Sequence, residues 1–534
     1  MGMSSDHLPP AGGPASSTDD SSAPGVLYRN GHVYSPGDPT ADALLVRGGT
    51  IAWLGETGDA PAADRVVDLN GALVTPAFVD AHMHTTSTGV TMLGLDLSGT
   101  GSADEVLRRV ADFAAGMPGD AVVIGHGWDE SGWSVRQPPT AVELDRAVGG
   151  RRAYLSQASV HSAVVSTPLL VQADQSLAGW NGEGWLRRDA HHAVREVAMG
   201  SLTVAQRREA QSVALRHAAS LGIAAVHECG GPGTSSEDDF TSVLACSGQG
   251  LPEVYGYWGE LGAAAKAREL GAVGAGGDLY ADGALGSQTA HLRVPYLDAD
   301  TSGHGYLSAE QVARHLVDCT RLGVQGGFHA IGDKAIATVM AGFGLAAAEV
   351  GMDAIRDARH RIEHVEIVDK QLIAGLVSFG VVASMQPAFD RLWGGEHGMY
   401  AQRLGVTRSM GANPIAALAG VGVTLAFGSD SPVTPLDPWG TVRAAMTHHN
   451  PVYRVGIRTA FAAHTRGGWR AVCRDDEGVL APGAPATFAV WDVEAVADGL
   501  PVLLGAGAED PVPALPVCRR TVLRGEVIFD SEQA

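Results

Sequence analysis

The stretch Phe78-Val79-Asp80-Ala81-His82-Met83-His84 joins an apolar run to a His-x-His pair. Such a run is typical of a buried strand, and both histidines stand at its C-terminal end. There the chain can curl so that the two imidazoles meet one metal ion, and imidazole suits zinc, iron and similar cations. Because the chain has 20 histidines, a His-x-His pair alone is a weak signal. Its meaning depends on the sequence around it.

The middle of the chain repeats a unit in which a helix-like segment ends at a glycine and an apolar run follows. Glycine is preferred just past a helix end, where φ is often positive. Helix starts are marked by the capping-box patterns Thr203–Gln206 and Ser308–Gln311. Repeated units of this kind predict parallel βαβ crossovers. The glycines are Gly222, Gly323, Gly380 and Gly422.

Eight apolar runs of this kind predict an α/β fold, a (β/α)8 TIM-like barrel. Several of the runs end in polar residues, which is where such barrels build their active sites. A doubly wound open sheet is the alternative, but it would more often carry a Gly-rich phosphate turn after the first strand, and none is present. The predicted strands lie near Phe78–His82, Ile223–His227, Val254–Tyr257, Leu279–Asp282, Gly326–His329, Arg361–His364, Val381–Gln386 and Leu425–Asp430.

Two further regions lie outside the predicted barrel of residues 76–470. The gap between its first two strands is too long for one connection, which predicts an insertion over about residues 88–200 on the catalytic face. Both ends of the chain are β-rich, with a hairpin predicted at Asn30-Gly31. We expect one small β-sandwich domain made of residues 25–75 and 471–534. Two unrelated β appendages are the alternative.

Composition excludes several classes of protein. The 534 residues carry 37 Lys+Arg and 59 Asp+Glu, and this net charge of −22 argues against binding to nucleic acid or to an anionic membrane. No run reaches the roughly 18 apolar residues of a membrane helix, and residues 1–24 resemble a disordered tail rather than a secretory signal. The 5 cysteines are scattered without a CxxC pair, which disfavours a disulfide framework. A soluble, cytoplasmic protein is expected.

Four histidines and an aspartate form the candidate metal site. His329, His364 and Asp430 each end an apolar run, as His82 and His84 do. A single histidine in such a place is more often a hydrogen-bonded core residue. Five such residues at the ends of predicted strands one, five, six and eight instead indicate a metal centre. The pairs His191-His192 and His448-His449 are interpreted as surface pairs.

These residues resemble the amidohydrolase superfamily, and within it the amidohydrolase-3 family that includes N-substituted formamide deformylases. The resemblance covers nearly the whole chain, including the β-rich ends. The motifs that carry it are Thr75–His84, Gly127–Trp133, Pro139–Asp145, Asp282–Ser287, His329–Asp333, Arg361–His364, Gln386-Pro387 and Gly428–Val433.

The resemblance implies that His82, His84, His329 and Asp430 bind a divalent metal, with Zn²⁺ favoured. It implies that His364 is either a further ligand or is oriented toward the nucleophile. In such enzymes the metal generates hydroxide at neutral pH. Asp430 would take the proton of the water and pass it to the leaving nitrogen, while the metal or His364 polarises the carbonyl. The family also implies a homodimer.

The chain departs from this family at Asp278. Many relatives carry a lysine there, four residues before the Asp-Gly pair, and in binuclear members that lysine is carboxylated and bridges two metals. Asp278 can bridge as a carboxylate, but we favour one metal over two. Glu228 is a second candidate for a second metal or for an outer position around the first. By resemblance, Asp282, His161 and Trp128 are candidates for substrate binding.

We therefore expect a metal-dependent hydrolase that uses metal-activated water on a non-peptide C–N bond, an amide or formamide, of a small molecule. A metal-dependent deaminase of a ring or amidine uses the same residues and is the first alternative. A non-catalytic binding protein on the same barrel is the second, and the complete set of candidate ligands argues against it. No Gly-x-Ser-x-Gly elbow is present, which disfavours serine acyl-enzyme chemistry.

Overall fold

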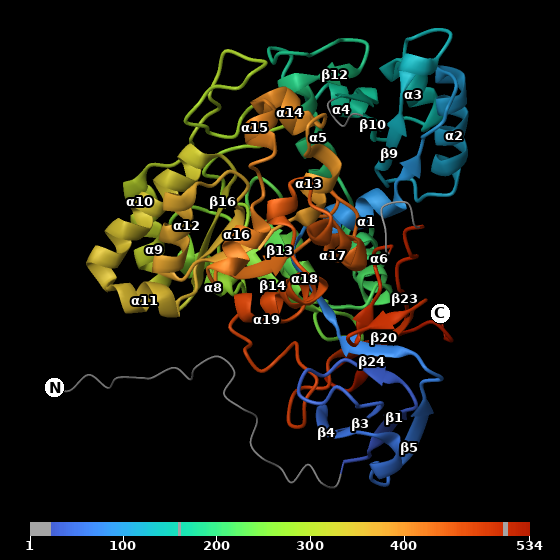
Figure 1. The fold of residues 1–534 in the computed structure, drawn as a ribbon. Coiled ribbons are helices and arrows are strands. Elements are labelled where there is room, and N and C mark those ends of the chain that lie inside the picture. Colours follow the sequence, from blue (N-terminus) through green and yellow to red (C-terminus); the bar gives the residue numbers. More distant parts are fainter. Residues whose placement is uncertain (1–22, 159–161, 506–510, 534) are drawn as a thin grey trace, which may run out of the picture.

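The computed structural model describes residues 23–158, 162–505 and 511–533. Its centre is an eight-stranded parallel sheet in the order β19-β18-β17-β16-β15-β14-β13-β7. A parallel bridge between Met83 and Ser431 brings the two edge strands together, so the sheet closes into the predicted TIM-like barrel (Figure 1). The prediction of the fold class is confirmed. The strands are β7 (Phe78–Met83), β13 (Ile223–Gly230), β14 (Glu253–Trp258), β15 (Gly274–Ala275), β16 (Gln325–Ala330), β17 (Arg361–His364), β18 (Val382–Met385) and β19 (Thr424–Phe427).

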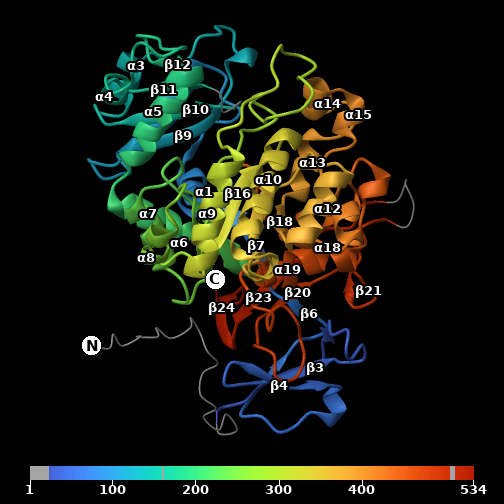
Figure 2. The same ribbon diagram turned by 90° about the vertical axis from the view of Figure 1, so that its left-hand side faces the viewer.

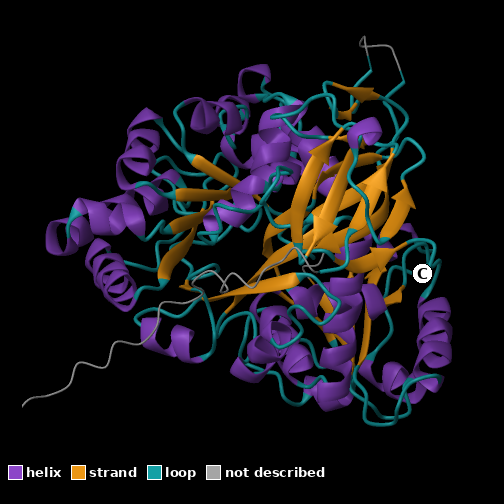
Figure 3. Ribbon diagram, turned by 90° about the horizontal axis from the view of Figure 1, so that it is seen from below, coloured by secondary structure: helices purple, strands orange, loops and turns teal. Residues whose placement is uncertain are grey.

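Helices surround the strands on the outside of the barrel (Figure 3). The capping boxes at Thr203 and Ser308 are both formed, and they begin α6 and α9. Gly323 and Gly380 end α9 and α12 in the left-handed conformation, as expected. The helices of this part are α1 (Thr85–Leu93), α6 (Val204–Ser220), α7 (Glu237–Leu244), α8 (Ala264–Glu269), α9 (Ala309–Leu322), α10 (Asp333–Val350), α11 (Met352–Asp357), α12 (Lys370–Phe379), α13 (Pro387–Trp393), α14 (Met399–Leu404), α15 (Val406–Ser409), α16 (Ile415–Gly420), α17 (Pro438–Met446), α18 (Ile457–His464) and α19 (Arg466–Ala471).

The fourth barrel strand lies earlier than predicted. The sequence predicts it at Leu279–Asp282, but β15 is Gly274–Ala275. A Cβ on Gly276 would lie 2.4 Å from the backbone nitrogen of Gly327, so only glycine allows the two chains to pack there. Gly277 then turns the chain with φ of +72°. As a result, Asp278 lies just past the strand end, where barrel active sites are built.

A second sheet occupies the chain between β7 and β13. Its order is β12-β11-β10-β9-β8, and it lies beside the barrel rather than in it (Figure 1). Apolar clusters cover both of its faces. Its strands and helices are β8 (Leu95–Asp96), α2 (Ala103–Ala115), β9 (Val123–Trp128), α3 (Ala141–Ala147), β10 (Ala153–Gln157), β11 (Ser162–Val165), α4 (Thr167–Leu170), β12 (Trp185–Arg187) and α5 (Arg188–Gly200).

The two ends of the chain meet in a pair of sheets below the barrel (Figure 2). One sheet is β4-β3-β1-β5, and the other is β2-β6-β20-β23-β24. In the second sheet β20 pairs antiparallel with β6, and Leu44, Val74 and Phe488 belong to the core between the two. The strands are β1 (Val26–Arg29), β2 (His32–Val33), β3 (Ala43–Arg47), β4 (Thr50–Gly55), β5 (Arg65–Asp68), β6 (Leu73–Pro76), β20 (Phe488–Asp492), β23 (Val517–Leu523) and β24 (Glu526–Asp530), with a small ribbon of β21 (Val496–Ala497) and β22 (Leu500–Pro501).

The predicted hairpin at Asn30-Gly31 is wrong. β1 pairs with β3 and β5, whereas β2 pairs with β6 in the other sheet. Asn30 has φ of +59°, and the turn carries the chain from one sheet to the other. The cause is burial, because this arrangement lets the apolar faces of both sheets pack against each other.

No helix among the described residues is long and apolar enough to cross a membrane. The predicted tail lies almost entirely outside the described residues, since its first 22 positions are not described.

Candidate metal centre

The ends of β7 and β19 interlock and bring His82, His84 and Asp430 together. The backbone N–H of Asp430 donates to the carbonyl of His82 at 2.7 Å, and the N–H of His84 donates to the carbonyl of Ser431 at 2.9 Å. Asp430 has φ of +55°, a left-handed conformation that is uncommon for a residue with a side chain. These two backbone hydrogen bonds fix the relative positions of the Cα atoms of His82, His84 and Asp430.

Two imidazoles and two carboxylates face one another at this point. The Oδ1 atom of Asp430 lies 3.5 Å from Nε2 of His82 and 3.2 Å from Nε2 of His84. From the other side, Asp278 places Oδ1 3.5 Å from Nε2 of His82 and Oδ2 3.3 Å from Nε2 of His84. We call these four side chains, His82, His84, Asp278 and Asp430, the donor cluster.

The carboxylates of the donor cluster are buried, so their negative charge is costly unless positive charge lies beside it. The side chain of His82 is fully buried, and that of Asp278 is 6% exposed. Burial alone would lower the pKa of His84, but hydrogen bonding and charge attraction from Asp278 and Asp430 outweigh it and hold that pKa well above its usual value. The two carboxylates therefore require positive charge beside them, which protons on the histidines or a cation can supply.

The donor cluster fits a divalent cation. In the described part of the chain, Nε2 of His82 and Oδ1 of Asp278 are buried and have no hydrogen-bond partner. Unpaired buried donors and acceptors are costly, so such atoms usually have a role that the protein alone does not satisfy. Imidazole nitrogens and carboxylate oxygens are the ligands that zinc takes in open, catalytic sites.

His364 adjoins the donor cluster at the end of β17. Its ring centroid lies 5.1 Å from that of His82, and its Nδ1 lies 2.8 Å from Oε1 of Gln386. Burial, followed by the charges of His329 and His82, lowers the pKa of His364 to about 4. A neutral His364 donates its Nδ1 proton to the amide oxygen of Gln386 and turns the lone pair of Nε2 outward.

His329 lies beside His364 but farther from the carboxylates of the donor cluster. The two ring centroids are 4.5 Å apart, and the ring of Tyr280 covers His329 at 4.8 Å. Among the described residues His329 belongs to no set of three donor atoms within 4.8 Å of one another. The structure thus groups His364 with the donor cluster and places His329 at its border.

The sequence did not predict the ion pair between Arg361 and Glu363, which holds Nδ1 of His82. Oε2 of Glu363 lies 2.9 Å from Nδ1 of His82, and Arg361 donates to both oxygens of Glu363, at 2.5 and 2.9 Å. Arg361 also donates to the carbonyl of Ala81 at 2.7 Å and lies 3.1 Å from Nδ1 of His227. The available signal was two charged residues at alternate positions of a central strand, which point into the barrel.

Two more buried carboxylates position the strand ends. Oε2 of Glu228 accepts the backbone N–H of Thr85 at 2.8 Å and so fixes the start of α1 directly after His84. Asp80, which the sequence did not single out, accepts the N–H groups of Ser429 and His82 at 3.0 and 3.2 Å. Burial raises the pKa of Asp80 to about 6. Both side chains contact backbone rather than the donor nitrogens.

Asp282 and Trp128, two of the residues expected to bind substrate, make their hydrogen bonds with backbone groups outside the donor cluster. Asp282 is fully buried and accepts three backbone N–H groups, from His291, Ile331 and Gly332, at 2.8 to 3.0 Å, so it holds loops together. Trp128 is 1% exposed, and its indole N–H donates to the carbonyl of Leu155 inside the core of the second sheet. His161 lies outside the described residues.

The two histidine pairs interpreted as surface pairs are each partly buried. The ring of His191 contacts the hydroxyl of Tyr154 at 2.8 Å, and His448 lies 3.4 Å from the buried carboxylate of Asp390. His449 is half exposed and lies 3.0 Å from the same carboxylate. The interpretation was wrong for His191 and His448, because polar partners on β10 and α13, Tyr154 and Asp390, allow their burial.

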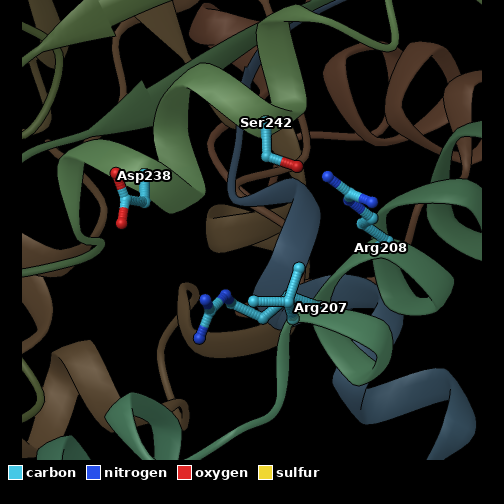
Figure 4. A pocket seen from close by; sticks show the side chains of 5 residues that line it. Arg207, Arg208, Asp238 and Ser242 are labelled. Atoms are coloured by element: carbon cyan, nitrogen blue, oxygen red, sulfur yellow. The ribbon is translucent and has the colours of Figure 1, made fainter.

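A surface depression of about 220 Å³ lies between α6 and α7, and none of its lining residues belongs to the donor cluster (Figure 4). It is lined by Val204, Arg207, Arg208, Asp238 and Ser242. Positive and negative side chains share its wall, so charge does not select a ligand for it.

Comparison with known proteins identifies the family. The model of the amidohydrolase family matches residues 65–529. The putative amidohydrolase YtcJ of Bacillus subtilis (strain 168) is 25% identical over 95% of this chain and 99% of its own. The N-substituted formamide deformylase of Arthrobacter pascens is 30% identical over 27% of this chain and 28% of its own. The crystal structure of an uncharacterized metal-dependent hydrolase from Pyrococcus furiosus is 25% identical, with a TM-score of 0.75 over 87% of this chain and 98% of its own.

The chain therefore belongs to the amidohydrolase family. It is a metal-dependent hydrolase that acts on carbon–nitrogen bonds other than peptide bonds. The family resemblance predicted from the motifs is confirmed.

Proposed function

We propose that this hydrolase uses water to cleave the C–N bond of an N-substituted amide or formamide of a small molecule, with Zn²⁺ as the favoured cation. The observation that carries the proposal is the donor cluster itself. It gathers two imidazoles and two carboxylates at the C-terminal ends of barrel strands, and two of its buried donor atoms have no hydrogen-bond partner in the described part of the chain. Likeness to the formamide deformylase over part of the chain supports the choice of substrate class.

His82, His84 and Asp430 would hold the cation, and His364 adjoins them. A divalent cation bound there lowers the pKa of water toward about 7, which makes hydroxide available at neutral pH. The protein contributes rigid donors, because the backbone ties between β7 and β19 and the ion pair below His82 keep their side chains in place.

Asp430 would act first as the general base and then as the general acid. Its carboxylate accepts the proton that the attacking water loses and then returns it to the nitrogen that leaves. One water is consumed, the C–N bond breaks, and a C–O bond forms at the carbonyl carbon. The products are a carboxylic acid, formic acid in the case of a formamide, and an amine.

His364 would orient the cation or the attacking water and would not donate a proton to the substrate. Because its Nδ1 proton is directed to Gln386 at 2.8 Å, Nε2 presents a lone pair to the donor cluster. It can ligate the cation or accept a hydrogen bond from the attacking water. In this protonation state it has no proton for the carbonyl oxygen of the substrate.

The test is turnover of a panel of N-substituted formamides and acetamides by the zinc-loaded protein. We expect equal amounts of carboxylic acid and amine, and loss of both products after treatment with a chelator. Release of ammonia from ring or amidine substrates, without any carboxylic acid, would instead support a deaminase. Turnover that persists without metal would contradict the proposal.

A further inference from the structure

The carbonyl oxygen of the substrate gains negative charge as water attacks, and a hydrogen-bond donor placed beside it would stabilise that charge. His364 does not supply this donor, since its Nδ1 proton is directed to Gln386 at 2.8 Å. Arg361 does not supply it either, because it donates to Glu363 and to the carbonyl of Ala81. The donor has to come from another side chain that contacts the donor cluster.

Tyr280 carries a hydroxyl that contacts the donor cluster. Its oxygen lies 3.3 Å from Oδ2 of Asp278, and the same carboxylate oxygen lies 3.3 Å from Nε2 of His84. A single carboxylate oxygen therefore separates the hydroxyl from an imidazole of the donor cluster. A phenol hydroxyl has one proton to donate, which is what the carbonyl oxygen of a substrate needs.

The backbone around Tyr280 holds its side chain in this place. A parallel bridge pairs Tyr280 with His329. The N–H of His329 donates to the carbonyl of Leu279, and the N–H of Ala281 donates back to the carbonyl of His329, both at 2.9 Å. Residues two apart in an extended chain point to the same side, so Tyr280 and Asp278 face the donor cluster together. The ring of Tyr280 also lies against that of His329, which fixes the direction of the hydroxyl.

Tyr280 is open to solvent, as a side chain that meets a substrate must be. It is 38% exposed, whereas Glu363 and His364, which also contact the donor cluster, are at most 2% exposed. The side chains of His84 and Asp430 are 15% and 10% exposed. A substrate that arrives from solvent can therefore contact Tyr280 together with the exposed part of the donor cluster.

The hydrogen bond between Tyr280 and Asp278 is easy to exchange for another. Its length of 3.3 Å exceeds the roughly 2.7–2.8 Å that is typical of a hydroxyl donating to an oxygen. The acceptor, Oδ2, also faces Nε2 of His84 and so keeps a partner when the hydroxyl turns away. A carbonyl oxygen at normal hydrogen-bond distance would therefore take the hydroxyl proton at little cost.

We propose that Tyr280 is a catalytic residue whose hydroxyl donates a hydrogen bond to the carbonyl oxygen of the substrate. The bond strengthens as that oxygen gains negative charge, so it stabilises the transition state more than the bound substrate. Tyr280 keeps its proton throughout, and the proton that reaches the leaving nitrogen still comes from water through Asp430. The inference rests on the proposed hydrolysis of an amide or formamide.

The experiment compares the zinc-loaded wild type with Tyr280→Phe, which removes the hydroxyl and keeps the ring. kcat, KM and zinc content are measured on the same preparations, with an N-substituted acetamide or formamide that the wild type hydrolyses. Inhibition by an N-substituted methylphosphonamidate is also measured, because its tetrahedral phosphoryl oxygens imitate the charged carbonyl oxygen. Tyr154→Phe is the matched control, since it removes a hydroxyl that contacts a histidine, His191, outside the donor cluster.

We expect Tyr280→Phe to lower kcat by about 10²–10³-fold and to weaken inhibition by the phosphonamidate by a similar factor. KM should stay within about threefold of the wild-type value, and zinc content should not change. Tyr154→Phe should keep the kcat and the inhibition of the wild type. A kcat of Tyr280→Phe within about threefold of the wild type would overturn the proposal. Loss of zinc together with activity would also overturn it, because Tyr280 would then act by holding Asp278.

Circular dichroism checks that each variant folds. If Tyr280→Phe does not, crystals of the wild type with zinc and the phosphonamidate decide. A Tyr280 hydroxyl within about 3.0 Å of a phosphoryl oxygen would support the proposal, and a hydroxyl that stays on Asp278 would overturn it.

Failure of the proposed function has a different signature. A wild type that hydrolyses no amide or formamide would refute the proposed function and this inference with it. An active wild type that is matched by Tyr280→Phe would refute this inference alone.

Discussion

Glu363 and Asp278 are both buried carboxylates that approach the two nitrogens of His82, yet their surroundings differ. Both oxygens of Glu363 accept hydrogen bonds from Arg361, and one also meets Nδ1 of His82. Oδ2 of Asp278 lies 3.3 Å from both the hydroxyl of Tyr280 and Nε2 of His84, while its Oδ1 has no hydrogen-bond partner among the described residues. The satisfied carboxylate holds the imidazole in place, and the unsatisfied one is available for chemistry.

The largest effect should come from removing a cluster nitrogen. We predict that His82→Ala and His84→Ala each lose both metal and turnover, because a direct ligand matters more than the roughly 10–100-fold of an outer partner. Metal content and rate should be measured on the same preparation. Full metal occupancy with normal turnover in either variant would show that the substituted histidine is not a metal ligand.

The next largest effect is expected at Asp430, which faces Nε2 of His82, as Asp278 does. Asp430→Asn keeps its size and one oxygen but cannot accept a proton. Turnover should fall by about 10²–10⁴-fold while most of the metal is retained. A variant that loses its metal together with its activity would make Asp430 chiefly a ligand. The proton would then have to be carried by another group.

Substitution of Glu363, the carboxylate that pairs with Arg361, should have a smaller effect on metal binding. Glu363→Gln leaves the Nδ1 proton of His82 with a neutral acceptor and removes the charge opposite Arg361. Metal affinity should fall about 10–100-fold. The free energy of unfolding should also drop, by about 3–5 kcal/mol, because the charge of Arg361 stays buried. Chelator competition and denaturant unfolding measure the two effects, and unchanged affinity would show that the ion pair does not orient the ligand.

The smallest effect on catalysis is expected far from the donor cluster, at Trp128. Trp128→Phe removes the N–H that satisfies the carbonyl of Leu155. The free energy of unfolding should fall by about 1–3 kcal/mol, while KM changes less than twofold. A tenfold rise in KM with unchanged stability would return Trp128 to the substrate pocket.

The parts of this molecule that the sequence predicts are those with a local signal. Apolar runs that end in histidine or aspartate place His82, His84 and Asp430 at strand ends, and the structure brings the Asp430 carboxylate within 3.5 Å of both imidazoles. Glycines and capping boxes mark the helices between those strands. Together these signals were enough for the fold class.

The rest depends on contacts between distant residues. The alternation at Leu279–Asp282 resembles a strand, but close packing of Gly276 on Gly327 ends the strand before Asp278. Nothing near Glu363 in the sequence shows that its partner is His82, 281 positions away. A buried tryptophan and a pocket tryptophan have the same local pattern, so the sequence alone does not show that the indole N–H of Trp128 donates to Leu155.

The most direct test of the metal centre is anomalous diffraction from wild-type crystals grown with zinc, measured at the zinc absorption edge. The account predicts one peak per chain, within about 2.0–2.2 Å of the Nε2 atoms of His82 and His84 and of a carboxylate oxygen of Asp430. A peak elsewhere, or no peak in protein that still turns over its substrate, would contradict it.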